Sequence, residues 1–80
     1  MNLEDEERAL CQANDDLREA DKRIQAQIDL LKEMERDGHD TSQGVSLLAA
    51  MREAREAMEG HRDRILQTID LLKKGKIKPR

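Results

Sequence analysis

The residues that could carry chemistry are few, and they lie in two short stretches. RDGHDTSQG (36–44) contains His39 next to Asp40, and HRD (61–63) begins with His61. Histidine titrates near neutral pH, binds metals and transfers protons. About six turns of helix separate the two histidines, so one chain cannot bring both to one metal ion. His39 is better explained as an exposed residue of a corner between helices.

Neither stretch completes a known reactive motif. HRD matches the opening of the protein-kinase catalytic loop, but the sequence lacks the glycine-rich loop, the strand lysine and the DFG motif that this chemistry needs. Thr68 also stands where the loop requires an asparagine. The corner lacks the alternating acidic ligands and the closing glutamate of a calcium loop. We therefore predict that the protein is not an enzyme and holds no metal or cofactor.

Composition predicts a single small helical domain. Of the 80 residues, 36% are hydrophobic and 41% charged, and none is aromatic, so Leu, Ile, Met and Ala must form a thin core. Cys11 is the only cysteine, which excludes an internal disulfide and suits a reducing compartment. The acidic start MNLEDEER does not resemble a secretory signal, and no apolar run reaches the length of a membrane span. We expect a cytoplasmic protein that does not enter membranes.

Apolar residues repeat every seven positions through the first half, as in the seam of a coiled coil. The main column is Leu3, Leu10, Leu17, Ile24 and Leu31, and the second column is Glu6, Ala13, Ala20, Gln27 and Met34. Cys11 lies outside both columns and is expected to be exposed. Gln27 is expected to fix the register of the helices, since a polar residue at a seam position commonly does so.

The second half repeats this pattern less strictly. One column is Met51, Met58, Ile65 and Leu72, and the other is Leu47, Ala54, His61 and Thr68. The second column places His61 in the seam, opposite Leu17, as another register-fixing residue. The predicted core and interface comprises Leu10, Leu17, Ile24, Ile28, Leu31, Met34, Leu48, Met51, Met58, Ile65, Ile69 and Leu72.

A helix stop separates the two halves. Gly38 suits the position after a helix end, and Asp40 or Thr41 can cap the next helix, with Gln43 completing a capping box. We predict one hairpin over residues 1–74, with helices at about 3–36 and 42–73, a corner at 37–41 and a basic frayed tail at 75–80. The second helix is expected to continue through Gly60, because the columns resume in register at Ile65.

Residues 21–66 resemble a group of short, functionally uncharacterised helical-hairpin proteins of proteobacteria. The likeness is carried by an Ile-x-x-Gln core, a Gly-His-Asp-Thr corner and a His-Arg-Asp-x-Ile-Leu segment. Here these elements are Ile24, Gln27, Gly38, His39, Asp40, Thr41, His61, Arg62, Asp63, Ile65 and Leu66. The resemblance implies a bacterial hairpin and no particular activity.

The charge pattern favours a hairpin whose ends neutralise each other. Residues 1–21 sum to −6 and residues 61–80 to +5. The fold class we predict is all-α, an antiparallel, coiled-coil-like two-helix hairpin. Its apolar stripe is wider than one seam needs, so we expect a homodimer that forms a four-helix bundle and binds a further, unidentified protein partner. The alternative is a nucleic-acid-binding hairpin that uses Arg52, Arg55, Arg62 and the tail, although no aromatic residue is available to stack on bases.

Overall fold

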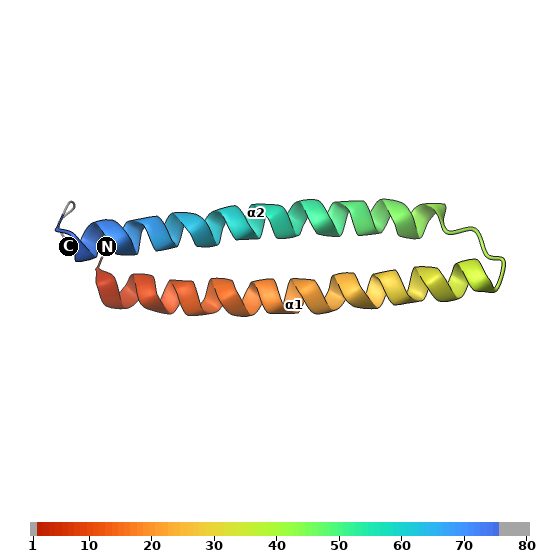
Figure 1. Cartoon of the computed structure of the whole chain (residues 1–80), viewed down its shortest axis with the longest axis horizontal. Helices are drawn as coiled ribbons and strands as arrows, with labels where there is room; N and C mark the ends of the chain where they lie inside the picture. The colour runs from red at the N-terminus through yellow and green to blue at the C-terminus, as the bar shows by residue number, and fades with distance from the viewer. Residues whose placement is uncertain (1, 76–80) are drawn as a thin grey trace.

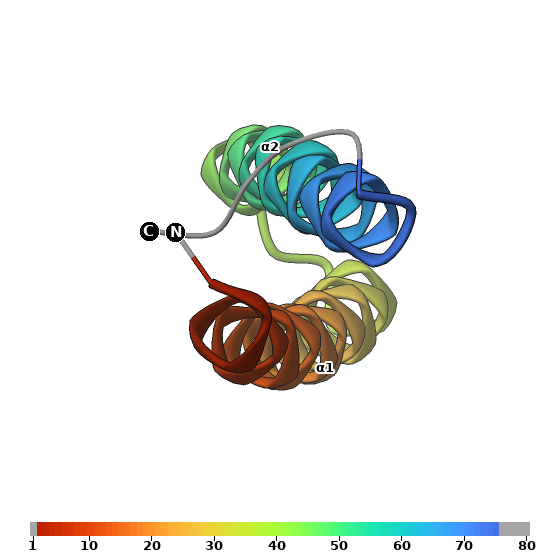
Figure 2. The same cartoon turned by 90° about the vertical axis from the view of Figure 1, so that its left-hand side faces the viewer.

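The protein is an antiparallel helical hairpin. The computed structural model describes residues 2–75, in which α1 (Leu3–Arg36) and α2 (Ser42–Lys73) lie side by side (Figure 1). Figure 2 shows that the two helices are inclined to each other rather than strictly parallel. The all-α, two-helix fold predicted from the heptad columns is confirmed. The expected frayed tail beyond Gly75 falls outside the described residues.

The first helix begins at a capped and acidic turn. Asn2 is the N-cap residue, and its side-chain oxygen accepts a hydrogen bond of 2.9 Å from the backbone N–H of Asp5. The first turn carries Glu4, Asp5 and Glu6, whose negative charges stabilise the positive end of the helix dipole. Sequence reasoning missed this cap, although an asparagine just before the first apolar residue is its usual signal.

The first helix ends in a Schellman motif, as the glycine suggested. Gly38 has φ of 79°, and its N–H donates to the carbonyl of Glu35 at 3.1 Å. The N–H of His39 donates to the carbonyl of Met34 at 2.9 Å. These two bonds use carbonyl groups that the helix itself leaves free, and the left-handed backbone they require favours glycine.

Asp40 stabilises the start of the second helix. Its Oδ1 accepts hydrogen bonds from the hydroxyl of Ser42 at 2.5 Å and from the backbone N–H of Ser42 at 3.0 Å. These two bonds lower the pKa of Asp40 because they favour its charged form. Thr41 is the N-cap residue, but its side chain makes no capping bond, and the capping box predicted between Asp40 and Gln43 is not formed.

The seam of the first helix follows the two predicted columns. Their members are buried or half-buried, from Leu3 to Met34. The buried residues of the two helices are Ala13, Leu17 and Leu31 of α1 and Ile65 and Ile69 of α2. Ala13 packs with the two isoleucines near the open end of the hairpin, where Leu3, Ala9 and Leu10 cover them.

One predicted column of the second helix is wrong. Leu47 is 52% exposed, and Ala54 and His61 are also exposed, so of this column only Thr68 is half-buried. The seam instead uses the neighbouring column, which comprises Leu48, Arg55, Arg62 and Ile69. Two arginines can occupy this column because their aliphatic stems are half-buried in the seam. Their guanidinium groups reach carboxylates at the edge of the seam.

The two helical glycines differ in their surroundings. A Cβ added to Gly44 would lie 2.4 Å from Cδ2 of Leu31, so the helices approach closely here because residue 44 lacks a side chain. At Gly60 an added Cβ would meet only the end of Arg64, at 3.9 Å. The helix runs through Gly60 without interruption, as predicted.

Candidate interaction surface

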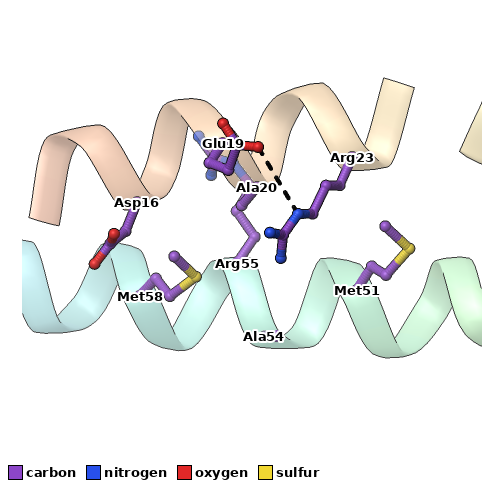
Figure 3. Close-up of a pocket in the computed structure, with 8 residues that line it drawn as sticks. All are labelled: Asp16, Glu19, Ala20, Arg23, Met51, Ala54, Arg55 and Met58. Atoms are coloured by element: carbon purple, nitrogen blue, oxygen red, sulfur yellow. Dashed lines mark ion pairs between the residues drawn. The ribbon is translucent and has the colours of Figure 1, made fainter. Parts of the chain in front are cut away.

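A shallow groove lies between the helices near the middle of the hairpin. Its volume is about 250 Å³. It is lined by Asp16, Glu19, Ala20, Arg23, Met51, Ala54, Arg55 and Met58 (Figure 3). No residue between positions 18 and 30 or between 42 and 64 is fully buried. The groove therefore marks the part of the hairpin where the packing of the two helices is incomplete.

Small and flexible apolar side chains form most of the groove. Met51 and Met58 extend from α2 toward α1, on either side of Ala54 (Figure 3). Ala20 faces them from α1 and is too small to fill the space between the two helices. Methionine is unbranched and adapts its shape to a contacting surface. This part of the groove is thus suited to packing against another apolar surface.

Arg55 crosses the seam beneath the groove. Its Nε donates to Asp21 of α1 at 2.5 Å, and its Nη1 donates to Glu59 at 2.6 Å. Both carboxylates raise the pKa of Arg55, with the hydrogen bond to Asp21 as the largest cause. The side chain of Arg55 is 33% exposed. Arg55 therefore forms an ion pair with Asp21 that joins the two helices, and among residues 2–75 it is the one ion pair that does so.

The charges at the rim of the groove are separated along the first helix. Asp16 lies beside Met58 at one end, and Arg23 lies nearer Met51 at the other (Figure 3). Asp16 accepts a hydrogen bond from Gln12 at 2.9 Å, and Arg23 lies 4.0 Å from Glu19. Exposed pairs of this kind contribute little to stability. The rim thus has an acidic end and a basic end.

Large apolar side chains continue the rim toward the corner. Leu30 is 48% exposed and follows Arg23 by seven residues, whereas Leu47 is 52% exposed and precedes Ala54 by seven. Residues seven apart lie on the same side of a helix. We call Ala9, Asp16, Arg23 and Leu30 the α1 row, and Leu47, Ala54, His61 and Thr68 the α2 row.

All twelve predicted core and interface residues lie in the hairpin seam or at its edge. Four are buried, namely Leu17, Leu31, Ile65 and Ile69. The other eight are half-buried, namely Leu10, Ile24, Ile28, Met34, Leu48, Met51, Met58 and Leu72. Ile69 is buried within the single hairpin, so its burial needs no partner chain. Leu30, Ala50 and Ala57 do remain exposed.

The polar candidates have different environments. The Nε2 of Gln27 donates to the carbonyl of Gly44 at 3.0 Å, so this seam residue links the two helices. His39 and His61 are both exposed, which overturns the seam position expected for His61. Cys11 is exposed, as predicted. Within residues 2–75, no three His, Cys, Asp or Glu side chains come together as a metal ion would require.

The described part of the chain contains no helix apolar and long enough to span a bilayer. Comparison with protein-family models, with curated proteins and with solved structures finds no match. The basic residues Lys76, Lys78 and Arg80, which were considered for contacts with nucleic acid, lie outside the described residues.

Proposed function

We propose that the protein is a small interaction module that acts as a homodimer and has no catalytic activity. The observation that carries this proposal is its incomplete burial of apolar residues. Among residues 2–75, five are buried, and no large side chain is less than 2% exposed. In the same described part of the chain, the large apolar side chains of Leu30, Val45, Leu47 and Leu66 remain 44% exposed or more.

The total exposed surface supports the same conclusion. The chain has a mass of 9.2 kDa and exposes 6172 Å². A compact folded monomer of this mass exposes about 4,900 Å². The excess is about 1,200 Å², and a typical stable interface buries about 800 Å² on each partner. The excess comes from the elongated shape of the hairpin, 58 × 15 × 15 Å, which leaves long sides for a partner to cover, and identical chains are the commonest partners in such assemblies.

The test is sedimentation equilibrium of the full chain at micromolar concentration. We expect the mass of a dimer and a melting temperature that rises with protein concentration, because dissociation is linked to unfolding. A single species of monomer mass, with unfolding that does not depend on concentration, would contradict the proposal.

Nucleic-acid binding is the alternative, and it has weaker support. Arg55 is bound to Asp21 and Glu59, and Arg62 is bound to Asp63 at 3.0 Å. Both guanidinium groups would have to exchange a carboxylate for a phosphate. Binding to mixed RNA and DNA, measured at low and physiological salt, tests this alternative. Submicromolar binding that weakens steeply as salt rises would favour it over the interaction module.

A further inference from the structure

We propose that the groove between Ala20 and Ala54 is the dimer interface, and that its occupant is the groove of a second copy related by a two-fold axis. This inference rests on the proposed self-association and names the surface that performs it. In the arrangement we propose, the axis crosses both helices at the level of Ala20 and Ala54. Each helix then packs antiparallel to the same helix of the second copy.

The rim charges complement themselves under this rotation. Asp16 and Arg23 lie on either side of the Ala20 level, about 10 Å apart along α1. A two-fold axis midway between them places Asp16 of one copy against Arg23 of the other, twice in the dimer. A shift of the register by one heptad instead opposes the two copies of Asp16 or the two copies of Arg23, and charge patterns of this kind favour one register.

The sizes of the side chains also match. In the α1 row, the same rotation sets exposed Leu30 against Ala9 of the second copy. In the α2 row, it sets Leu47 against His61 of the second copy and brings the two copies of Ala54 together. Leu30 thus meets a smaller residue and Leu47 meets a polar residue of similar size, while the small alanines allow the helices to approach closely at the axis. The two exposed leucines both become covered in this arrangement.

The methionines complete the contact. Met51 and Met58 lie on either side of Ala54 in the groove (Figure 3). The rotation exchanges their levels, so Met51 of one copy meets Met58 of the other. Each groove is then filled by side chains of the opposite hairpin. The α2 row was assigned to the internal seam from the sequence, and the fold leaves most of it exposed. In the proposed dimer, this row becomes part of the interface between the two copies.

A charged side chain placed on the axis tests the surface. Ala54→Arg brings two guanidinium groups together at the centre, and we expect it to weaken dimerisation by roughly 100-fold. Ala49→Arg is the matched control, because Ala49 is also an exposed alanine of α2 but lies outside both rows. We expect the control to sediment as a dimer. Circular dichroism establishes that both variants remain helical.

The outcomes separate this inference from the proposed function. A wild-type monomer contradicts both. A wild-type dimer that persists in Ala54→Arg, or that is lost equally in Ala49→Arg, overturns the choice of surface and leaves self-association standing.

Charge exchange gives a second test that leaves the alanines intact. Asp16→Arg and Arg23→Asp each place like charges opposite one another, and we expect each to weaken the dimer by roughly tenfold. The double variant restores opposite charges and is expected to recover dimerisation. If the double variant is as weak as the sum of the single variants, the proposed register is wrong.

Discussion

The open end of the hairpin and its middle are built on the same heptad repeat but pack differently. At the open end, Ala13 is enclosed by Ile65 and Ile69, and all three are buried. In the middle, the equivalent positions carry methionine and arginine, and none of these residues is buried. The repeat thus determines which side of each helix faces its neighbour, whereas the volume and shape of the side chains determine whether the contact closes.

The cause of the difference is the fit between the helices. A β-branched isoleucine beside an alanine fills the short distance between two helices with little loss of side-chain freedom. Arg55 cannot fill the seam in this way, because its charged end must reach Asp21 and Glu59 at the edge. The open end stabilises the single hairpin, and the middle is left available for a second one.

The largest expected effect is loss of the packed end. Ile65→Ala removes a buried side chain and should lower the free energy of unfolding by about 3 kcal/mol. Met58→Ala should cost about 1 kcal/mol at low protein concentration, because Met58 is only half-buried in the single hairpin. Urea unfolding measures both values. Equal costs at low concentration would show that the two regions do not differ in packing.

The two glycines give the next largest contrast. Gly44→Ala should lower the free energy of unfolding by about 2 kcal/mol, since the new methyl group meets Leu31 and crowds Gln27. Gly60→Ala should raise it by about 1 kcal/mol, because alanine favours helix and the position is open. Each variant serves as the control for the other in thermal unfolding. The structure predicts opposite signs for the two variants.

The corner should show a small dependence on pH. The pKa of Asp40 is lowered in the folded chain, so its contribution to stability is complete above its ordinary value of about 3.9 and is lost as the pH falls through the folded value. Asp40→Ala should therefore lower the melting temperature at neutral pH and approach the wild type in acid. Asp40→Asn keeps an acceptor for Ser42 and is the control. A difference that stays constant down to pH 2 would contradict this role.

Thiol accessibility distinguishes the exposed and the packed faces of the first helix. Cys11 is exposed, and we expect a thiol reagent to label it rapidly in the folded chain. A cysteine at the packed end, Ala13→Cys in a Cys11→Ser background, should react at least about tenfold more slowly, because Ala13 is 6% exposed. Similar labelling rates would mean that the core at the open end is not closed.

The fold could be predicted from sequence because its signals are local and repeated. The column from Leu3 to Leu31 recurs every seven residues, and Gly38 interrupts it with a residue suited to a left-handed turn. The second helix was less predictable. Its seam column contains Arg55 and Arg62, so the neighbouring column with Leu47 and Ala54 reads as more apolar, and only the positions of Asp21 and the other carboxylates show why the arginines lie in the seam.

The candidate surface could be predicted only in part. The width of the apolar stripe indicated that one seam would not cover it, and Leu30 is indeed exposed. The groove itself depends on the relative positions of Ala20, Met51 and Met58 on two helices, which a single sequence does not specify. The role of Gly44 was likewise not predictable, since its close approach to Leu31 is a property of the folded hairpin.

The most direct test of the central claim is a nuclear Overhauser measurement across the interface. Copies with ¹³C-labelled methionine methyl groups are mixed with unlabelled copies, and signals between the two kinds of chain are selected. We predict intermolecular signals from the methyl groups of Met51 and Met58 and none from Met34, which lies near the corner and outside the groove. A dimer in which Met51 and Met58 show no intermolecular signal would contradict the account.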